Sequence, residues 1–303
     1  AWLESTGKLS RASMSRTIQA LRICQQKLKR HKVKHMRLVA TEACRRAGNG
    51  AGFMRQITRE TGLSLDIIKP EEEARLAVIS CAPLVSTKTE QLLVVDIGGG
   101  STELVWIDLS AVPKPERPKA IMRLHAGFHT QDSPFAAAKV VDWISVPLGV
   151  ATLRDHFDDV EDDAARFALM SWYFEEHLSE FAPYKDEQSR EGFQIVGTSG
   201  TVTTVAASHL GLKRYDRNKV DGLRMTSDQI DKVIRMYLNL GPAGRRRDPR
   251  IGQDRQALIM SGAAILQALL RCWPTDQLSV ADRGLREGLL YAQMSADGVL
   301  EDG

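Results

Sequence analysis

The segment QLLVVDIGGGSTELVWIDL (Gln91–Leu109) decides the fold class of this 303-residue chain. It begins with a continuous apolar run, turns at three consecutive glycines, and continues with a second run rich in β-branched and aromatic residues. This pattern predicts a strand, a tight turn and a second strand. Ahead of it, Pro70 and three glutamates predict the start of a helix, because proline suits the first turn and carboxylates suit the positive end of the helix dipole.

The remaining sequence alternates predicted strands and helices. Residues 144–157 and 193–212 each repeat the order strand, glycine loop, helix, and LIMSGAAILQALL (258–270) predicts a buried helix before a last strand and helix. Three prolines within 111–119 predict a loop that leads into a strand at Ala120–His125. Gly241, Pro242 and Gly244 predict an irregular basic loop. The alternation favours an α/β protein.

Composition narrows the class of protein. A chain of 303 residues with 43% hydrophobic residues favours two lobes, and a net charge of only +3 argues against a polycation that coats nucleic acid. The basic runs at 27–37 and 245–250 lack the interleaved aromatic residues of single-strand binders, so we expect no nucleic-acid partner. The longest apolar stretch is too short to cross a bilayer. Four scattered cysteines without a CxxC pair favour a reducing, cytoplasmic location.

The glycine turn carries the strongest chemical signal. Backbone amides of Gly98, Gly99 and Gly100 approach a ligand closely because no side chain intervenes, which suits phosphate oxygens. Asp96, at the end of the strand, suits a Mg²⁺–water shell beside that phosphate. The alternative interpretation is a tight hairpin turn without a ligand.

A second glycine loop follows the apolar strand near residue 195 and precedes a helix, where free amides and the helix dipole favour anions. It matches neither the P-loop nor the Rossmann pattern, and an ordinary strand-to-helix turn is an equal alternative. Its candidate phosphate-binding residues are Gly197, Thr198, Ser199, Gly200 and Thr201.

Five motifs in matching order resemble the exopolyphosphatase/guanosine pentaphosphate phosphohydrolase (Ppx/GppA) family of the actin-like ATPase superfold. They are ATEACRRAGN (40–49), EEEARL (71–76), DIGGGSTELVW (96–106), VGTSGTVTT (196–204) and ADRGLREGLLY (281–291). The resemblance implies two ribonuclease-H-like lobes with a cleft between them. We expect residues 1–72 plus 283–303 in the N-terminal lobe, and residues 73–282, with both glycine loops, in the second.

The resemblance also implies a function. It implies an enzyme, a phosphoanhydride hydrolase that releases orthophosphate from the end of polyphosphate and converts guanosine pentaphosphate to tetraphosphate, with Mg²⁺. Such chemistry depends mainly on positioning and charge neutralisation. Which of the two substrates is preferred stays open. Members of that family are often dimers, so a homodimer is one expected state.

Residue roles follow from the same resemblance. Asp96 and Glu103 would hold the metal, and the amides from Gly98 to Thr102, Ser101 included, would bind phosphate. Glu73 would be the general base on the attacking water, with Glu71 and Glu72 as alternatives. Arg45 would face the anion. Without the resemblance, Glu73 reads as one acid of a helix N-terminal turn.

The sequence departs from the family at its start. Relatives carry an earlier Asp-x-Gly-Ser-Asn loop, and no such motif precedes Ser10. We expect an incomplete first lobe, because the protein is longer, because the chain was shortened, or because the loop has been lost. Loss of the loop would favour a non-catalytic sensor that binds polyphosphate or guanosine polyphosphates. A sugar-kinase-like ATPase is a weaker alternative.

Overall fold

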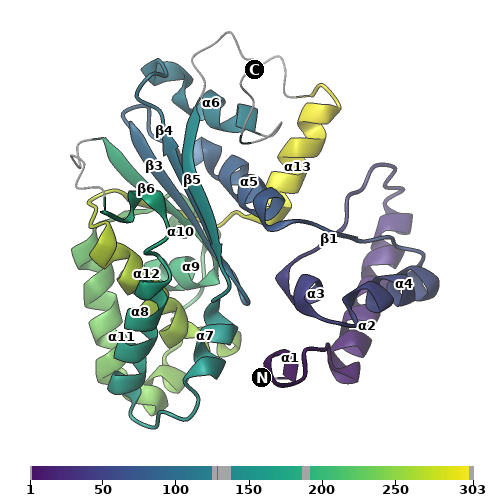
Figure 1. The fold of residues 1–303 in the computed structure, drawn as a ribbon, viewed down its shortest axis with the longest axis horizontal. Coiled ribbons are helices and arrows are strands. Elements are labelled where there is room, and N and C mark those ends of the chain that lie inside the picture. Colours follow the sequence, from purple (N-terminus) through teal and green to yellow (C-terminus); the bar gives the residue numbers. More distant parts are fainter. Residues whose placement is uncertain (1, 125–127, 129–137, 186–191, 300–303) are drawn as a thin grey trace. The chain divides into compact units, whose positions relative to one another are not determined.

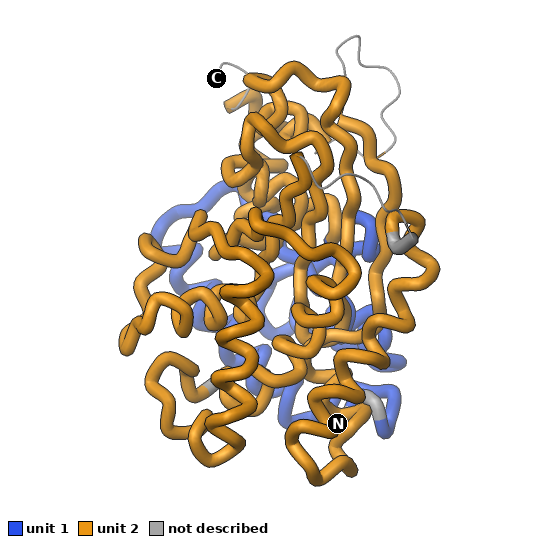
Figure 2. The backbone as a smooth tube through the Cα atoms, turned by 90° about the vertical axis from the view of Figure 1, so that its left-hand side faces the viewer, with its two compact units in different colours: residues 1–73 blue, residues 74–303 orange. Residues whose placement is uncertain are grey.

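The chain forms two units, residues 1–73 and residues 74–303 (Figure 2). The structure is a computed structural model that describes residues 2–124, 128, 138–185 and 192–299 (Figure 1). Helix α5 (Pro70–Cys81) begins in the first unit and continues in the second.

The first unit is a small helical layer beside a two-stranded parallel sheet. Its long amphipathic helix is capped by Ser10, whose hydroxyl accepts a hydrogen bond from the amide of Ser13 at 3.1 Å. The buried Ile18 of this helix packs with Phe53 and Ile57. The elements ahead of α5 are α1 (Trp2–Thr6), α2 (Arg11–Arg30), β1 (Val39–Ala40), α3 (Glu42–Arg46), α4 (Gly50–Thr61) and β2 (Asp66–Ile67).

The second unit is built on a six-stranded mixed sheet. Strands β3, β4 and β5 form an antiparallel meander, β6 and β8 extend the sheet parallel to β3, and β7 closes the edge antiparallel to β8. The strand order is β5-β4-β3-β6-β8-β7. The strands are β3 (Gln91–Ile97), β4 (Thr102–Asp108), β5 (Lys139–Val146), β6 (Phe193–Thr198), β7 (Arg224–Met225) and β8 (Leu278–Ala281).

Helices cover the sheet of the second unit. In chain order after α5 they are η1 (Ala82–Leu84), η2 (Lys114–Glu116), α6 (Arg117–Arg123), α7 (Val150–His156), α8 (Asp163–Glu176), η4 (Ala182–Lys185), α9 (Gly200–His209), α10 (Arg217–Val220), α11 (Ser227–Arg247), η5 (Gln253–Arg255), α12 (Ile259–Cys272) and α13 (Leu285–Ala296).

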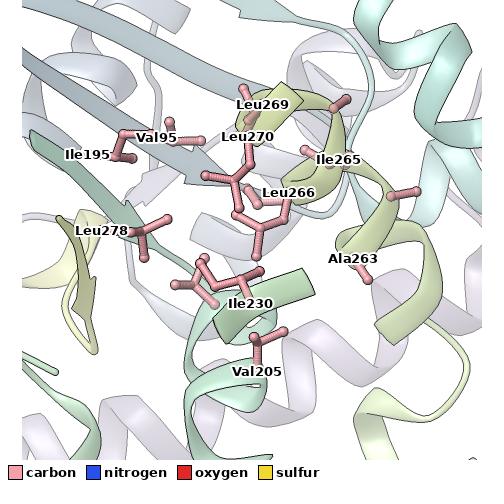
Figure 3. Close-up of a cluster of buried hydrophobic side chains, with 14 of the residues drawn as sticks. Val95, Ile195, Val205, Ile230, Ala263, Ile265, Leu266, Leu269, Leu270 and Leu278 are labelled. Carbon is pink, nitrogen blue, oxygen red and sulfur yellow. The ribbon is translucent and has the colours of Figure 1, made fainter. Parts of the chain in front are cut away.

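Both faces of the sheet are packed. Figure 3 shows part of the larger core, with Val95, Ile195 and Leu278 of the strands beside Leu266 and Leu269 of α12. Side chains alternate along a strand, so Gln194 points to the opposite face. There its amide donates to the carbonyl of Leu84 in η1 at 2.9 Å. The predicted α/β class, the central strand pair and the buried helix at 258–270 are therefore confirmed.

The predicted strand at 120–125 is wrong. Residues 117–123 form helix α6 instead, and His125 lies outside the described residues. Pro118 stands in the first turn, where its missing N–H is not needed. The 2%-exposed side chain of Arg117 donates to the carbonyls of Val112 and Thr87, which holds this helix to the preceding loop.

The predicted loop at 241–247 is also wrong, because α11 continues through it with a kink. Gly241 adopts φ 60°, which glycine tolerates without steric cost, and Pro242 opens the next helical turn. The buried Arg245 then donates to Asp163 at 2.8 Å and to the carbonyl of Tyr237 at 2.8 Å. These tertiary bonds stabilise a segment whose local sequence favours a break.

The C-terminal helix α13 belongs to the second unit by its contacts. A Cβ on Gly288 would lie 2.1 Å from the carbonyl oxygen of Leu76, so α13 and α5 pack closely. The assignment of residues 283–303 to the N-terminal lobe stays a prediction. In the described part of the chain, no helix is long and apolar enough to cross a membrane.

Candidate functional site

The glycine turn joins β3 to β4 as expected. The amide of Gly98 donates to the carbonyl of Ser101 at 2.9 Å, which closes the turn. A Cβ on Gly98 would lie 2.8 Å from that carbonyl oxygen, so only glycine fits there. The amide of Gly98 is therefore used within the turn.

The N-terminus of α7 binds the carbonyl side of this turn. The amides of Val150 and Ala151 donate to the carbonyls of Gly98 and Gly99 at 3.0 and 2.9 Å. Gly149 permits this approach, because a Cβ on it would lie 2.5 Å from the carbonyl oxygen of Gly98. Within the described part of the chain, the amides of Gly99, Gly100 and Ser101 donate to no group. These three amides are therefore candidates for binding an anion.

Thr102 has a structural role at this turn. Its side chain is fully buried, and its hydroxyl donates to the carbonyl of Leu148 at 2.7 Å. The bond ties the end of the turn to the segment before α7. The Thr102 hydroxyl is therefore not available to a phosphate.

The two predicted metal carboxylates are direct cross-strand neighbours. Asp96 on β3 pairs in register with Glu103 on β4, so both side chains lie on the same face of the sheet. Thr198 on β6 is in register with Asp96 on its other side. Buried Glu103 accepts hydrogen bonds at Oε1 from the hydroxyls of Ser101 at 2.7 Å and Ser145 at 2.9 Å. These bonds fix its orientation.

The second glycine loop is a capped helix start. Ser199 has φ 151°, a strained backbone for a residue with a side chain, and its Oγ accepts from the amides of Thr201 and Val202 at 3.1 and 3.2 Å. Those two amides are already satisfied. Gly197 packs on the methyl groups of Val202, and the hydroxyl of Thr198 donates to the carbonyl of Arg283. Most polar groups of this loop thus have protein partners.

Arg255 lies over the second loop, and no sequence pattern pointed to it. A Cβ on Gly200 would lie 1.2 Å from Nη1 of Arg255, so the guanidinium occupies the space that a side chain would fill. The exposed Arg255 places a positive charge at the N-terminus of α9. Fifty-five positions separate the two residues, and no local pattern connects them.

Glu73 and Arg45 form a buried ion pair within the first unit. Nη1 of Arg45 lies 2.8 Å from Oε2 of Glu73, and the two side chains are 14% and 12% exposed. Nη1 of Arg45 also donates to the carbonyl of Ile68 at 2.8 Å, and Oε2 of Glu73 has no well-aligned hydrogen bond within the described residues. Burial raises the pKa of the Glu73 carboxyl, and the charge of Arg45 only partly offsets this. This environment makes Glu73 a candidate general base.

The other two glutamates of the same turn are in different surroundings. Glu72 pairs with Arg37, and both Glu71 and Glu72 are partly exposed. Neither side chain is buried as that of Glu73 is. Glu73 is therefore the best candidate of the three.

Fold and sequence comparisons define the class of protein. The mixed sheet is that of the actin-like ATPase fold. The Ppx/GppA family member of Aquifex aeolicus has a similar structure, with a TM-score of 0.73 and 29% identity over 97% of this chain and 85% of that one. An exopolyphosphatase from Cytophaga hutchinsonii shares the fold with a TM-score of 0.77 at 21% identity, over 97% of this chain and 85% of that one.

Residues 1–297 match the model of the Ppx/GppA phosphatase family, and the chain belongs to that family. The guanosine-5'-triphosphate,3'-diphosphate pyrophosphatase of Aeromonas salmonicida is 28% identical over 292 residues. The match covers 96% of this chain and 51% of that protein, so the chain spans about half the length of this relative. The expected fold and family are confirmed.

Proposed function

We propose that this protein hydrolyses a phosphoanhydride bond and releases orthophosphate from the end of polyphosphate or from guanosine pentaphosphate. The observation that carries the proposal is the buried Glu73 carboxylate, whose Oε2 is paired with Arg45 at 2.8 Å yet has no well-aligned hydrogen bond within the described residues. Such an oxygen is suited to accept a proton from water.

The proposal assigns the terminal phosphate to the glycine turn. The amides of Gly99, Gly100 and Ser101 donate to phosphate oxygens while α7 holds the carbonyls of the turn away. The guanidinium of Arg255, beside Gly200, adds positive charge for a second phosphate group. Backbone amides fixed by neighbouring structure lose little freedom when the anion binds.

Asp96 and Glu103 fit a Mg²⁺ ion. Among the described residues no three His, Cys, Asp or Glu side chains lie together, so the protein offers a carboxylate pair. Magnesium is commonly held by one or two carboxylates, with waters and substrate phosphates as its other ligands. When bound, the ion supplies neutralisation of phosphate charge. The hydroxyls of Ser101 and Ser145 keep Glu103 oriented for this role.

The chemical step transfers one phosphoryl group to water. The oxygen of water forms a bond to the terminal phosphorus as the bond from phosphorus to the bridging oxygen breaks. Glu73 takes a proton from the attacking water, and the leaving phosphate oxygen ends protonated or as a free anion. The products are orthophosphate and a chain or nucleotide shorter by one phosphate.

The test is release of orthophosphate from guanosine pentaphosphate and from polyphosphate, each with and without Mg²⁺. Support comes from Mg²⁺-dependent release with either substrate, and from its loss in Asp96→Asn. The relative from A. salmonicida is named for the nucleotide, which makes that substrate the first to test. Tight binding of both anions without turnover would instead identify a sensor.

A further inference from the structure

One arginine in the first unit serves two carboxylates. Nε and Nη2 of Arg45 donate to Oε2 of Glu42 at 3.2 and 2.9 Å, and Nη1 donates to the carbonyl of Ile68 at 2.8 Å. Glu73 therefore lies beside a guanidinium that donates three of its five N–H bonds to Glu42 and Ile68, and Oε2 of Glu73 has no well-aligned hydrogen bond within the described residues. Glu42 lies on the same short helix α3 as Arg45. It accepts hydrogen bonds from the Nε–Nη2 edge of the guanidinium, which is the edge that best matches a carboxylate.

We propose that Glu42 is a positioning residue for Glu73: it holds the Nε–Nη2 edge of Arg45, so that Glu73 has a nearby positive charge but keeps Oε2 free to accept a proton. This inference rests on the proposed role of Glu73 as the base. Glu42 does not contact the reacting atoms in this account and acts only through Arg45.

The same three side chains have two alternative arrangements. Without Glu42, the planar fork of Arg45 is free to form two parallel hydrogen bonds with Glu73, which is the strongest geometry for this pair. Both Glu73 oxygens would then be occupied, and the carboxylate would hold protons more weakly. Glu42 prevents this by binding the same edge.

Burial makes the competition effective. The side chains of Glu42, Arg45 and Glu73 are 15%, 14% and 12% exposed, so water and salt screen their charges weakly. Arg45 and Glu42, both on α3, act on Glu73 through their charges, and the side chain of Thr41 also bonds to it. Arg46 adds a weaker contact to Glu42, with Nε 3.8 Å from Oε1.

The test compares Glu42→Gln and Glu42→Asp with wild type. Steady-state orthophosphate release is measured across pH, and the Glu73 carboxyl is titrated directly by NMR with ¹³C-labelled glutamate, assigned through Glu73→Gln. We expect Glu42→Gln to lower the pKa of Glu73, to move the acid limb of the kcat profile to lower pH, and to reduce plateau kcat about ten-fold. KM should change less than about two-fold.

Two control variants make the experiment decisive. Glu42→Asp keeps the negative charge, so the acid limb of its kcat profile should lie close to that of wild type. Glu60→Gln removes a carboxylate of the same unit, from a pair with Arg22, and should leave the Glu73 titration unchanged. An unchanged Glu73 pKa in a folded Glu42→Gln protein overturns the inference, whatever its activity. Full activity of Glu73→Gln overturns the base assignment instead, so the two failures are distinguishable.

Discussion

Glu73 and Asp248 are two buried carboxylates with opposite titration behaviour. Burial raises the pKa of Glu73, with Arg45 opposing, whereas hydrogen bonds from Arg250 lower the pKa of Asp248 despite burial. A raised pKa means that the folded protein holds its proton more tightly than the unfolded chain does. A lowered pKa means the reverse. The two residues therefore make the unfolding free energy change with pH in opposite directions.

For Glu73, stability should fall as pH rises. Between the ordinary glutamate pKa and the raised one, the folded state binds more protons, so the unfolding free energy decreases with pH. Glu73→Gln removes this dependence. Urea unfolding of both proteins across pH 4–8, about the range in which a raised carboxyl titrates, measures it. The unfolding free energy of wild type should decline relative to that of the variant, and parallel curves would contradict the raised pKa.

For Asp248, stability should fall as pH drops. Nε of Arg250 lies 2.8 Å from Oδ1 of Asp248, and the carboxylate side chain is 4% exposed. The stabilisation is complete above the ordinary aspartate pKa and is lost as pH falls through the lowered one. Asp248→Asn should cost about 1–3 kcal/mol at neutral pH and progressively less in acid. An equal loss of unfolding free energy at neutral and at acid pH would contradict the lowered pKa of Asp248.

At the scale of elements, the glycine turn and helix α7 act as one structure. A Cβ on Gly149 would lie 2.5 Å from the carbonyl oxygen of Gly98, whereas a Cβ on Gly99 would meet no atom within 4 Å. Gly149→Ala should therefore lower the unfolding free energy by more than about 1 kcal/mol. Gly99→Ala is the matched control and should change it by less than about 0.5 kcal/mol. Equal losses of unfolding free energy in the two variants would show that close packing of α7 against the turn does not stabilise the protein.

Some elements could be predicted from the sequence, and others could not. The turn at 98–101 was predictable because its glycines are consecutive and the flanking strands are strongly apolar. The continuation of α11 past Gly241 was not, because it depends on the bonds of Arg245 to Asp163 and Tyr237, which are distant in sequence. The placement of Arg255 against Gly200 is of the same kind. Local sequence patterns predict contacts between residues that are close in sequence, whereas the contacts of Arg245 and Arg255 join residues that are far apart in sequence.

At the scale of the whole molecule, charge is unevenly distributed along the chain. Between Ser5 and Thr41 stand ten lysines and arginines and no aspartate or glutamate, although the net charge is only +3. All ten side chains are exposed. Exposed charges of one sign attract a polyanion over about a Debye length. The composition predicted a weakly charged protein, and local placement gives one segment a strong charge.

This segment should affect long polyanions more than short ones. Replacing Lys29, Lys32 and Lys34 by glutamate should raise KM for long-chain polyphosphate several-fold, at about 0.05 M salt, with kcat unchanged. The effect should shrink at about 0.5 M salt, where the Debye length is shorter. Steady-state kinetics with long polyphosphate and tripolyphosphate at both salt concentrations measure this. An equal rise of KM for tripolyphosphate would contradict it.

The central claim is that Glu73 is the base of a phosphoanhydride hydrolase. The most direct measurement is single-turnover release of orthophosphate from guanosine pentaphosphate and polyphosphate by wild type, Glu73→Gln and Glu71→Gln, with melting curves as a check on folding. The account predicts that Glu73→Gln loses about 10²–10⁴-fold in rate, while Glu71→Gln keeps the rate of wild type within about two-fold. A folded Glu73→Gln protein as fast as wild type would contradict it.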